Sequence, residues 1–199
     1  MEFSDALHRR RMVRNYLDTP IEKGTLERIA AAATRAPSAG YSQGQAVVVV
    51  TDPGVRLRIA EAVGEARYVA QGFDPWISRA PALLVMCVSE EAYHRRYREP
   101  DKLREDGTEI EWPVPYWWVD AGASLMAVLL AAVAEGLAAG FLGGHAIDDL
   151  RAVLDIPPEY QVVGVVTVGH PAPDRRSGSL DRGPRPRSQV IHRDRWSLA

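Results

Sequence analysis

The chain has 199 residues, of which 46% are hydrophobic and 25% are charged, a composition typical of one ordinary globular domain rather than of a disordered or fibrous protein. Its single cysteine, Cys87, cannot form an internal disulfide and gives no metal-ligand spacing, so we expect a cytoplasmic location and no bound metal. A formal net charge of −2 argues against a nucleic-acid binder. The charged N-terminus also lacks the apolar core of a secretory signal.

Hydrophobic periodicity predicts the secondary structure in chain order. Helices are expected over residues 3–12, 22–35, 55–66, 90–98 (with Ser89 as N-cap), 118–139 and 147–154. Strands are expected over residues 46–51, 82–88 and 161–168. The uninterrupted VVVV run in the first strand is typical of a strand buried on both faces. This order of elements favours one α+β domain over residues 1–199, with a central sheet and helices on its faces.

Two segments carry more apolar surface than a single domain needs. The helix expected over residues 118–139 has Ala, Leu and Val on every side, but its apolar stretch is shorter than the roughly 20 residues that cross a bilayer. The tail over residues 172–199 is rich in Arg, Pro, Gly and Ser, yet Val190, Ile191 and Trp196 give it apolar anchors, which favours an arm that docks. We therefore predict an obligate homodimer with no membrane association.

Arg10, Arg11 and Arg14 form a basic cluster near the N-terminus. On a helix, Arg10 and Arg14 lie one turn apart on a common face. Guanidinium groups bind phosphate oxygens through paired donors, so the cluster suits a phosphate. A solvated helix face is the alternative interpretation.

Two further segments have compositions that suit a ligand. The loop over residues 36–45, APSAGYSQGQ, offers backbone N–H groups and hydroxyls to the edge of a heteroaromatic ring, or it is a plain connection. The glycines after the long helix let the backbone approach a ligand, although Gly140 also suits a helix C-cap and His145 suits a turn better than a base. Dinucleotide-binding, P-loop and serine-hydrolase motifs do not occur.

Taken in order, four segments of the chain resemble the FMN-dependent nitroreductase family across nearly the whole sequence: RRMVRNY, APSAGYSQ, WVDAGASLMAVLLAAVAEGLAAGFLGG and DIPPEYQVVGVVTVGHP. The resemblance implies an α+β homodimer with a central mixed sheet and a C-terminal arm. It also implies two FMN sites at the dimer interface, each drawing on both subunits.

The resemblance assigns cofactor contacts to particular positions. Arg10, Arg11, Met12 and Arg14 match the cluster that holds the FMN phosphate and ribityl chain. The loop that reaches the flavin from the partner subunit is matched by Pro37, Ser38, Ala39, Tyr41 and Gln43. Gly143 and Gly144 match the segment beside the isoalloxazine ring, and Arg182 or Arg185 matches a second phosphate contact.

The resemblance implies hydride transfer from a reduced nicotinamide to nitroaromatic, quinone or similar acceptors, in a ping-pong cycle; the sequence leaves NADH, NADPH and a deazaflavin open as donors. The flavin carries out this chemistry, so no catalytic protein residue is expected. Met12, Tyr41 and the pair Gly44-Gln45 depart from the usual pattern. Two alternatives are therefore a different flavin chemistry (reductive dehalogenation or flavin cleavage) and a non-catalytic flavin-binding dimer.

The segment over residues 100–115 is charged, aperiodic and longer than most structureless loops, which is typical of a mobile lid. It leads into an aromatic stretch that contains Trp112 and Tyr116. These two residues either form an apolar wall against the acceptor or anchor the start of the long helix.

Overall fold

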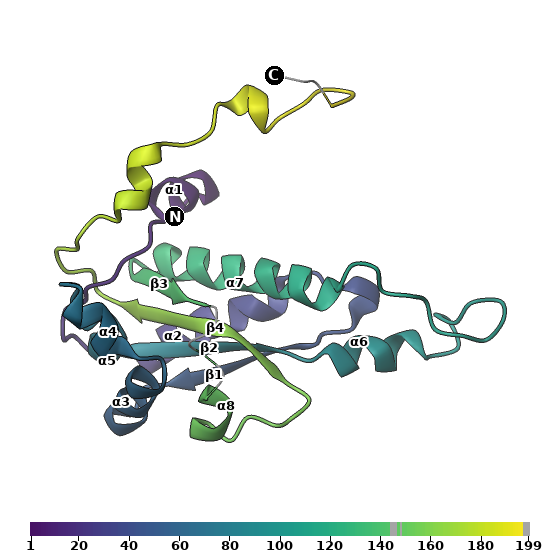
Figure 1. The fold of residues 1–199 in the computed structure, drawn as a ribbon, viewed down its shortest axis with the longest axis horizontal. Helices are drawn as coiled ribbons and strands as arrows, with labels where there is room; N and C mark the ends of the chain where they lie inside the picture. Colours follow the sequence, from purple (N-terminus) through teal and green to yellow (C-terminus); the bar gives the residue numbers. More distant parts are fainter. Residues whose placement is uncertain (144–146, 148, 197–199) are drawn as a thin grey trace.

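The computed structural model describes residues 1–143, 147 and 149–196. Its centre is a four-stranded sheet in the order β1-β2-β4-β3 (Figure 1). The strands are β1 (Gln45–Val50), β2 (Ala82–Val88), β3 (Ala138–Leu142) and β4 (Gln161–Gly169). Neighbouring strands pair antiparallel, which corrects the expectation of a mixed sheet. In the described part of the chain, parallel pairing is confined to an isolated bridge between Met12 and Ala139.

β2 and β4 are confirmed as buried strands at the centre of the sheet. Every residue of β2 is at most 3% exposed. Side chains alternate across a strand, so Leu83, Val85 and Cys87 pack into one core cluster, whereas Leu84 and Met86 pack into the other. The sheet is therefore covered on both faces.

β1 lies at the edge of the sheet, so the expectation of a strand buried on both faces is wrong. Its residues 45–48 are half-buried, and Val49 is 43% exposed. A run of valines indicates a strand because branched side chains fit a pleated surface, but it does not distinguish a central strand from an edge strand.

β3 occupies residues that the sequence pattern places in and just after the long helix. That helix, α7 (Tyr116–Ala134), ends earlier than expected because Gly136 adopts a left-handed φ of 78° and reverses the chain. Gly140 is therefore not a C-cap but a strand residue. A side chain at Gly140 would collide with the carbonyl of Val13.

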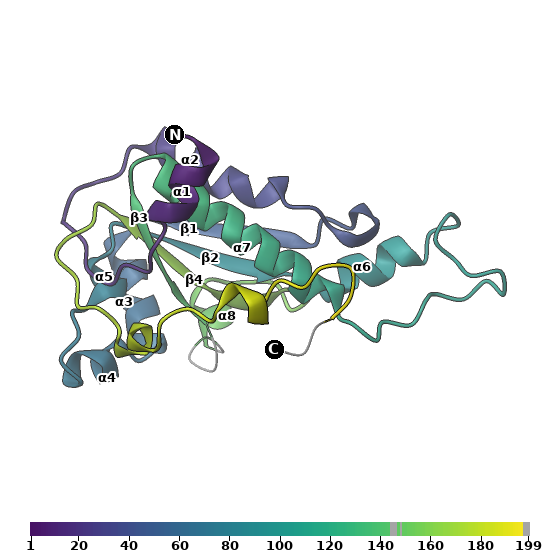
Figure 2. The ribbon, with the colours of Figure 1, turned by 90° about the horizontal axis from the view of Figure 1, so that it is seen from above.

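Helices cover the two faces of the sheet (Figures 1 and 2). On one face lie α7, α2 (Lys23–Ala31) and the 3-10 helix η1 (Ala32–Arg35). α2 and η1 together match the helix expected over residues 22–35. The other face is covered by α3 (Pro53–Ala62), α5 (Trp76–Arg79) and α8 (Leu150–Val153), with α4 (Glu65–Ala70) beside them. Two further helices are α1 (Phe3–Arg9), at the N-terminus, and α6 (Glu90–Tyr97), which follows β2.

The expected helix boundaries need three corrections. The helix expected over residues 55–66 is split by Gly64, whose left-handed φ of 70° separates α3 from α4. The helix expected over residues 3–12 ends at Arg9, and the one expected over residues 147–154 is limited to α8. The N-cap of α6 is confirmed, because the Ser89 hydroxyl accepts the Ala92 N–H at 3.2 Å.

α7 has the length and hydropathy of a membrane-crossing helix, with 19 residues. In this fold, Val128 and Leu129 on one side of it pack into the core. On the other side, Val119 and Met126 are 53% and 43% exposed. α7 is therefore a core helix with an uncovered apolar side.

Tyr16 joins the N-terminal segment to β4. Its hydroxyl donates to the Val13 carbonyl at 2.7 Å and contacts the Thr167 hydroxyl at 2.6 Å, and the ring is 2% exposed. Burial raises the pKa of this phenol, which keeps the hydroxyl protonated as a donor.

We predict that Tyr16→Phe lowers the free energy of unfolding by about 1–3 kcal/mol, because it leaves buried polar groups without a partner. Urea denaturation measures the change, with Tyr160→Phe as a control outside this network. A loss below about 0.5 kcal/mol would mean that the hydroxyl does not hold the segment.

Candidate functional site

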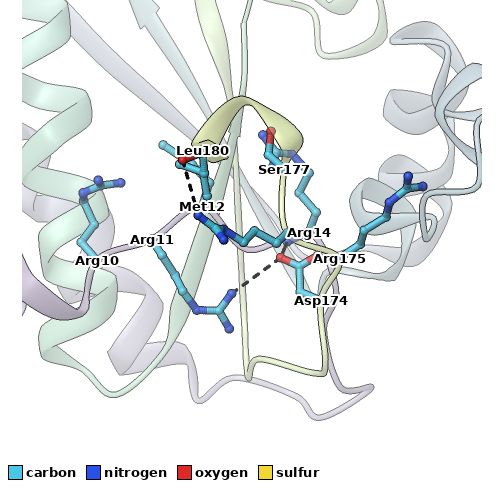
Figure 3. A pocket seen from close by; sticks show the side chains of 9 residues that line it. Arg10, Arg11, Met12, Arg14, Asp174, Arg175, Ser177 and Leu180 are labelled. Atoms are coloured by element: carbon cyan, nitrogen blue, oxygen red, sulfur yellow. Dashed lines mark hydrogen bonds and ion pairs between the residues drawn. The ribbon is translucent and has the colours of Figure 1, made fainter. Parts of the chain in front are cut away.

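A pocket of about 570 Å³ lies between the N-terminal segment and the start of the tail (Figure 3). Its walls include five arginines and one carboxylate: Arg10, Arg11, Arg14, Arg175, Arg176 and Asp174. Met12 and Leu180 add apolar surface. We call this the arginine pocket.

The N-terminal wall of the arginine pocket is extended chain, whereas the sequence pattern predicts a helix there. α1 ends at Arg9, and Arg10 adopts the extended conformation. The Val13 N–H then donates to the Ala139 carbonyl at 3.0 Å, which lays the segment against β3. Arg10 and Arg14 therefore reach the pocket from an extended segment, and the helix-face interpretation is wrong.

The tail closes the other wall. The Ala172 N–H donates to the Asn15 carbonyl at 3.1 Å, and the Asn15 side chain donates to the Pro173 carbonyl at 2.7 Å. Next along the tail, Asp174 accepts the backbone N–H of Arg14 at 2.9 Å. The Asp174 side chain is only 7% exposed and lies 3.7 Å from the guanidinium of Arg11.

Positive charge exceeds negative charge in the arginine pocket. Within the described residues, the guanidinium groups of Arg10, Arg14 and Arg175 have no carboxylate within 4.0 Å. Two of them lie near aromatic rings instead: Arg14 is 5.7 Å from the Trp76 centroid and Arg175 is 5.1 Å from the Phe73 centroid. Unpaired guanidinium groups at the wall of a pocket suit a phosphate dianion. No cluster of metal-binding side chains occurs among the residues described.

The tail arginines in the pocket differ from those that the resemblance indicates. Arg182 and Arg185 are exposed and lie outside the pocket lining, and Arg185 donates to the Gln189 carbonyl at 2.8 Å. Arg175 and Arg176, two arginines of the same tail to which the resemblance gives no contact, line the pocket instead. The local sequence does not distinguish these two arginines from the later arginines of the tail, because the pairing of the tail with Asn15 brings them to the pocket.

β3 leads from the arginine pocket to the glycines assigned to the flavin ring. Met12 pairs with Ala139 of β3 in an isolated bridge. Gly143 follows Ala139 by four residues, which is about 13 Å along an extended chain. Gly143 is exposed. Gly144 and His145 lie outside the described residues.

The loop assigned to the flavin edge, residues 37–43, lies far from the arginine pocket within one chain. The Ala39 N–H donates to Asp120 near the start of α7, whereas Arg11 lies near Val133 at the end of α7. Those positions are 13 residues apart, or about 20 Å along the helix. The chain brings Arg10, Arg11, Met12 and Arg14 together, but it does not bring the residues of the loop to them: Pro37, Ser38, Ala39, Tyr41 and Gln43.

The chain after α6 projects beyond the rest of the fold before it returns to α7 (Figure 2). Trp112, in this segment, is the centre of an aromatic cluster. Its ring centroid lies 4.6 Å from that of Tyr97, 5.8 Å from that of Trp117 and 6.2 Å from that of Tyr93. These contacts favour the anchor interpretation for Trp112. Tyr116 is 46% exposed at the start of α7.

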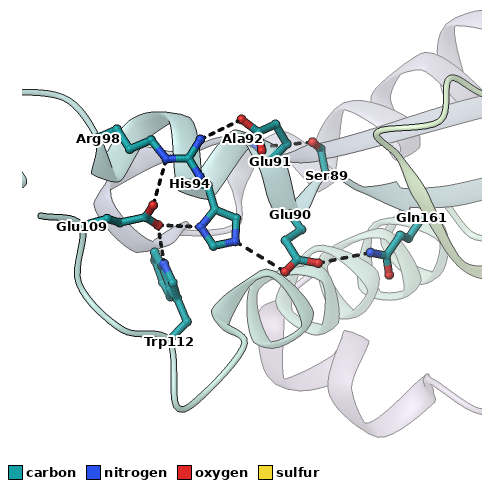
Figure 4. A network of polar contacts seen from close by, with 9 residues as sticks. All are labelled: Ser89, Glu90, Glu91, Ala92, His94, Arg98, Glu109, Trp112 and Gln161. Atoms are coloured by element: carbon teal, nitrogen blue, oxygen red, sulfur yellow. Dashed lines mark hydrogen bonds and ion pairs between the residues drawn. The ribbon is translucent and has the colours of Figure 1, made fainter.

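Glu109 ties the projecting segment to α6 (Figure 4). One carboxylate oxygen accepts the Trp112 indole N–H at 2.7 Å and lies 2.5 Å from Nδ1 of His94. The other oxygen accepts from Nε of Arg98 at 3.0 Å. Nε2 of His94 faces Glu90 at 3.5 Å. The imidazole therefore lies between two carboxylates.

The charges of this network shift two pKa values in opposite directions. Partial burial lowers the pKa of His94, but hydrogen bonds to Glu109 and Glu90 and their charges outweigh it, so the pKa rises above its ordinary 6.5. Burial raises the pKa of Glu109, but hydrogen bonds from Trp112, His94 and Arg98 outweigh it, so the pKa falls below its ordinary 4.5.

We predict that the stabilisation from the His94–Glu109 pair is present between the two ordinary pKa values. It is lost as the pH rises above 6.5 through the raised pKa of His94, and as the pH falls below 4.5 through the lowered pKa of Glu109. His94→Gln should therefore flatten the decline in unfolding free energy as the pH rises above 6.5, as measured by urea denaturation. His8→Gln is the control, and equal slopes in the two variants would contradict the pairing.

Residues 7–170 match the model of the Nitroreductase family. A protein of Archaeoglobus fulgidus, whose name assigns it as an NADH dehydrogenase/NAD(P)H nitroreductase, is 28% identical over 194 residues, which cover 96% of each chain. Iodotyrosine deiodinase of Nematostella vectensis is 24% identical over 92% of this chain and 72% of its own. The structure of the NADPH:FMN oxidoreductase of Vibrio harveyi, complexed with NAD+, has a TM-score of 0.72 at 21% identity, with 99% of this chain and 79% of that chain covered. The chain therefore belongs to the nitroreductase family of NAD(P)H-dependent oxidoreductases.

Proposed function

We propose that the protein is an FMN-dependent oxidoreductase that transfers hydride from NADH or NADPH to nitroaromatic, quinone or similar conjugated acceptors. The observation that carries the proposal is the arginine pocket, where unpaired guanidinium groups meet at one end of β3. The names of the similar proteins from Archaeoglobus fulgidus and Vibrio harveyi support a nicotinamide donor and FMN.

In this proposal, Arg10, Arg11 and Arg14 hold the phosphate of FMN, with Arg175 and Arg176 on the facing wall. Met12 would contact the ribityl chain, and Gly143 and Gly144, which have no side chains, would leave room for the ring. Bound FMN would supply the hydride transfer itself, and the protein residues bind it, orient it and limit the access of water. Donor and acceptor would bind in turn to the site so formed, as the ping-pong cycle of this proposal requires.

The complete site needs a second copy of the chain. Residues 37–43 lie about 20 Å along α7 from the arginine pocket of their own chain, so the loop serves the flavin of the partner subunit. The uncovered side of α7 and the exposed tail residues Val190, Ile191 and Trp196 offer apolar surface for that contact. On docking, the tail also carries Arg182 and Arg185 towards a second phosphate contact.

Deiodination is a second candidate, because iodotyrosine deiodinase of Nematostella vectensis aligns with most of this chain. Tyr116, which is 46% exposed at the start of α7, would face the aromatic acceptor in either reaction, with the ring of Trp112 packed behind it. Steady-state turnover with a nitroaromatic, a quinone and an iodotyrosine under the same donor separates the candidates. A chain that binds FMN and turns over none of them is a flavin-binding dimer.

A cytoplasmic location suits these reactions and the single thiol.

We predict that Arg10→Ala and Arg14→Ala each weaken FMN binding by about 1.5–3 kcal/mol, because each removes a charge-assisted contact to the phosphate. Titration of the flavin-free protein with FMN measures the affinity. Arg58→Ala, on the exposed side of α3, is the control. Unchanged affinity in both pocket variants would remove the phosphate assignment.

We predict a stable homodimer with more than about 2,000 Å² of total buried surface. Val119→Lys should weaken it, because it places a charge on the uncovered side of α7. Leu57→Lys is a matched control, because Leu57 is also 53% exposed but lies on α3. Sedimentation equilibrium gives the mass, and a folded wild-type monomer of 21.9 kDa would refute the dimer.

A further inference from the structure

We propose that Asp120, together with Tyr93 and Arg96, holds residues 38–43 in a strained conformation and thereby positions the ring end of the flavin. The three residues are positioning residues that act through the loop. The inference rests on the proposed function, since it assumes that this loop contacts a flavin.

The loop has an unusually strained backbone for residues with side chains. Tyr41 and Gln43 adopt left-handed φ values of 60° and 51°. Gly40, which directly precedes Tyr41, also has a φ of 60°. A non-glycine residue in this region costs about 1–2 kcal/mol. Such strain persists only where the surroundings impose it, and it is concentrated at functional sites. Tyr41 gains little packing in return, because its side chain is 79% exposed.

Asp120 provides the first external constraint on the loop. Its Oδ2 atom accepts the Ala39 N–H at 2.8 Å and the Tyr93 hydroxyl at 2.8 Å. Tyr93 is fully buried, and burial followed by the hydrogen bond and charge of Asp120 raises the pKa of its phenol. The hydroxyl therefore stays protonated and donates. One carboxylate oxygen on α7 thus fixes both the entrance of the loop and a side chain of α6.

Arg96 provides the second external constraint. Its Nε donates to the Gly40 carbonyl at 3.0 Å, while its two terminal nitrogens donate to Asp101 at 2.8 Å and 2.7 Å. Gly40 itself fits tightly, because a side chain there would meet the Tyr97 ring. Arg96 therefore joins the loop to the start of the projecting segment.

Among the described residues, the remaining hydrogen bonds of residues 38–43 lie within the loop, so they do not tie it to the rest of the fold. The Gln43 N–H donates to the Ser38 hydroxyl at 3.0 Å, and the Ser42 hydroxyl donates to the Ala39 carbonyl at 2.6 Å. Without Asp120 and Arg96, these bonds would move with the loop. The two external constraints therefore preorganise the backbone N–H groups that the flavin ring would meet, which lowers the entropic cost of binding it.

The test separates the ring end of the site from its phosphate end. Flavin-free, full-length protein is titrated with lumiflavin, which is the ring alone, and with inorganic phosphate. We expect Asp120→Asn, Tyr93→Phe and Arg96→Gln to weaken lumiflavin binding about tenfold, the effect of one lost hydrogen bond to a charged group, without changing phosphate binding. Arg14→Ala should weaken phosphate binding only. Arg95→Gln, on the exposed side of the same helix, is the matched control.

Two further readouts distinguish positioning from general destabilisation. Amide hydrogen exchange over residues 38–44 should become faster in the Asp120 and Arg96 variants than in Arg95→Gln, while exchange in β2 stays unchanged. Tyr41→Gly removes backbone strain, so it should raise the melting temperature while weakening lumiflavin binding. If Asp120→Asn fails to fold, Tyr93→Phe keeps the ring and removes only the hydroxyl.

The outcomes are distinct. Wild-type protein that binds neither FMN nor phosphate refutes the proposed function and the positioning role with it. Wild-type protein that binds FMN, with lumiflavin affinity and loop exchange in all three variants equal to those of Arg95→Gln, overturns the positioning role alone.

Discussion

The close contact between the N-terminal segment and β3 is the constraint on which the site depends. The Val13 N–H binds the Ala139 carbonyl, and Gly140 leaves room for the Val13 carbonyl because it has no side chain. Without this contact, Arg10 and Arg14 would continue a helix or lie in solvent. Because of the same contact, β3 is both a strand of the sheet and the link between the arginine pocket and Gly143. A backbone interaction thus determines where a phosphate and a ring could lie relative to each other.

The fold was predictable where local pattern and burial agree. β2 and β4 are apolar runs in the sheet centre, and the sequence pattern locates both. The pattern misplaced β3 because its five residues, AAGFL, continue the apolar composition of α7, and only the left-handed turn at Gly136 separates the two elements. It also gave β1 a central place, because strand propensity carries no information about which neighbours a strand finds.

The candidate site was predictable in residue type and less so in geometry. A cluster of arginines indicates an anion whether its backbone is helical or extended, so Arg10, Arg11 and Arg14 could be named from composition. Arg175 and Arg176 could not be preferred over later tail arginines, because their place follows from tail pairing with Asn15. The strain at Tyr41 was invisible, since no local signal marks a non-glycine residue that distant side chains force into the left-handed region.

The hydrogen bond between the Arg14 N–H and Asp174 joins residues 160 positions apart. Closing a loop of this length costs conformational entropy before the contact contributes any energy. During synthesis, the N-terminal arginines are made first, and nearly the whole chain must follow before the residues of the facing wall are made. The arginine pocket is thus a feature of the finished molecule. A chain truncated before the tail would therefore lack the facing wall of the arginine pocket.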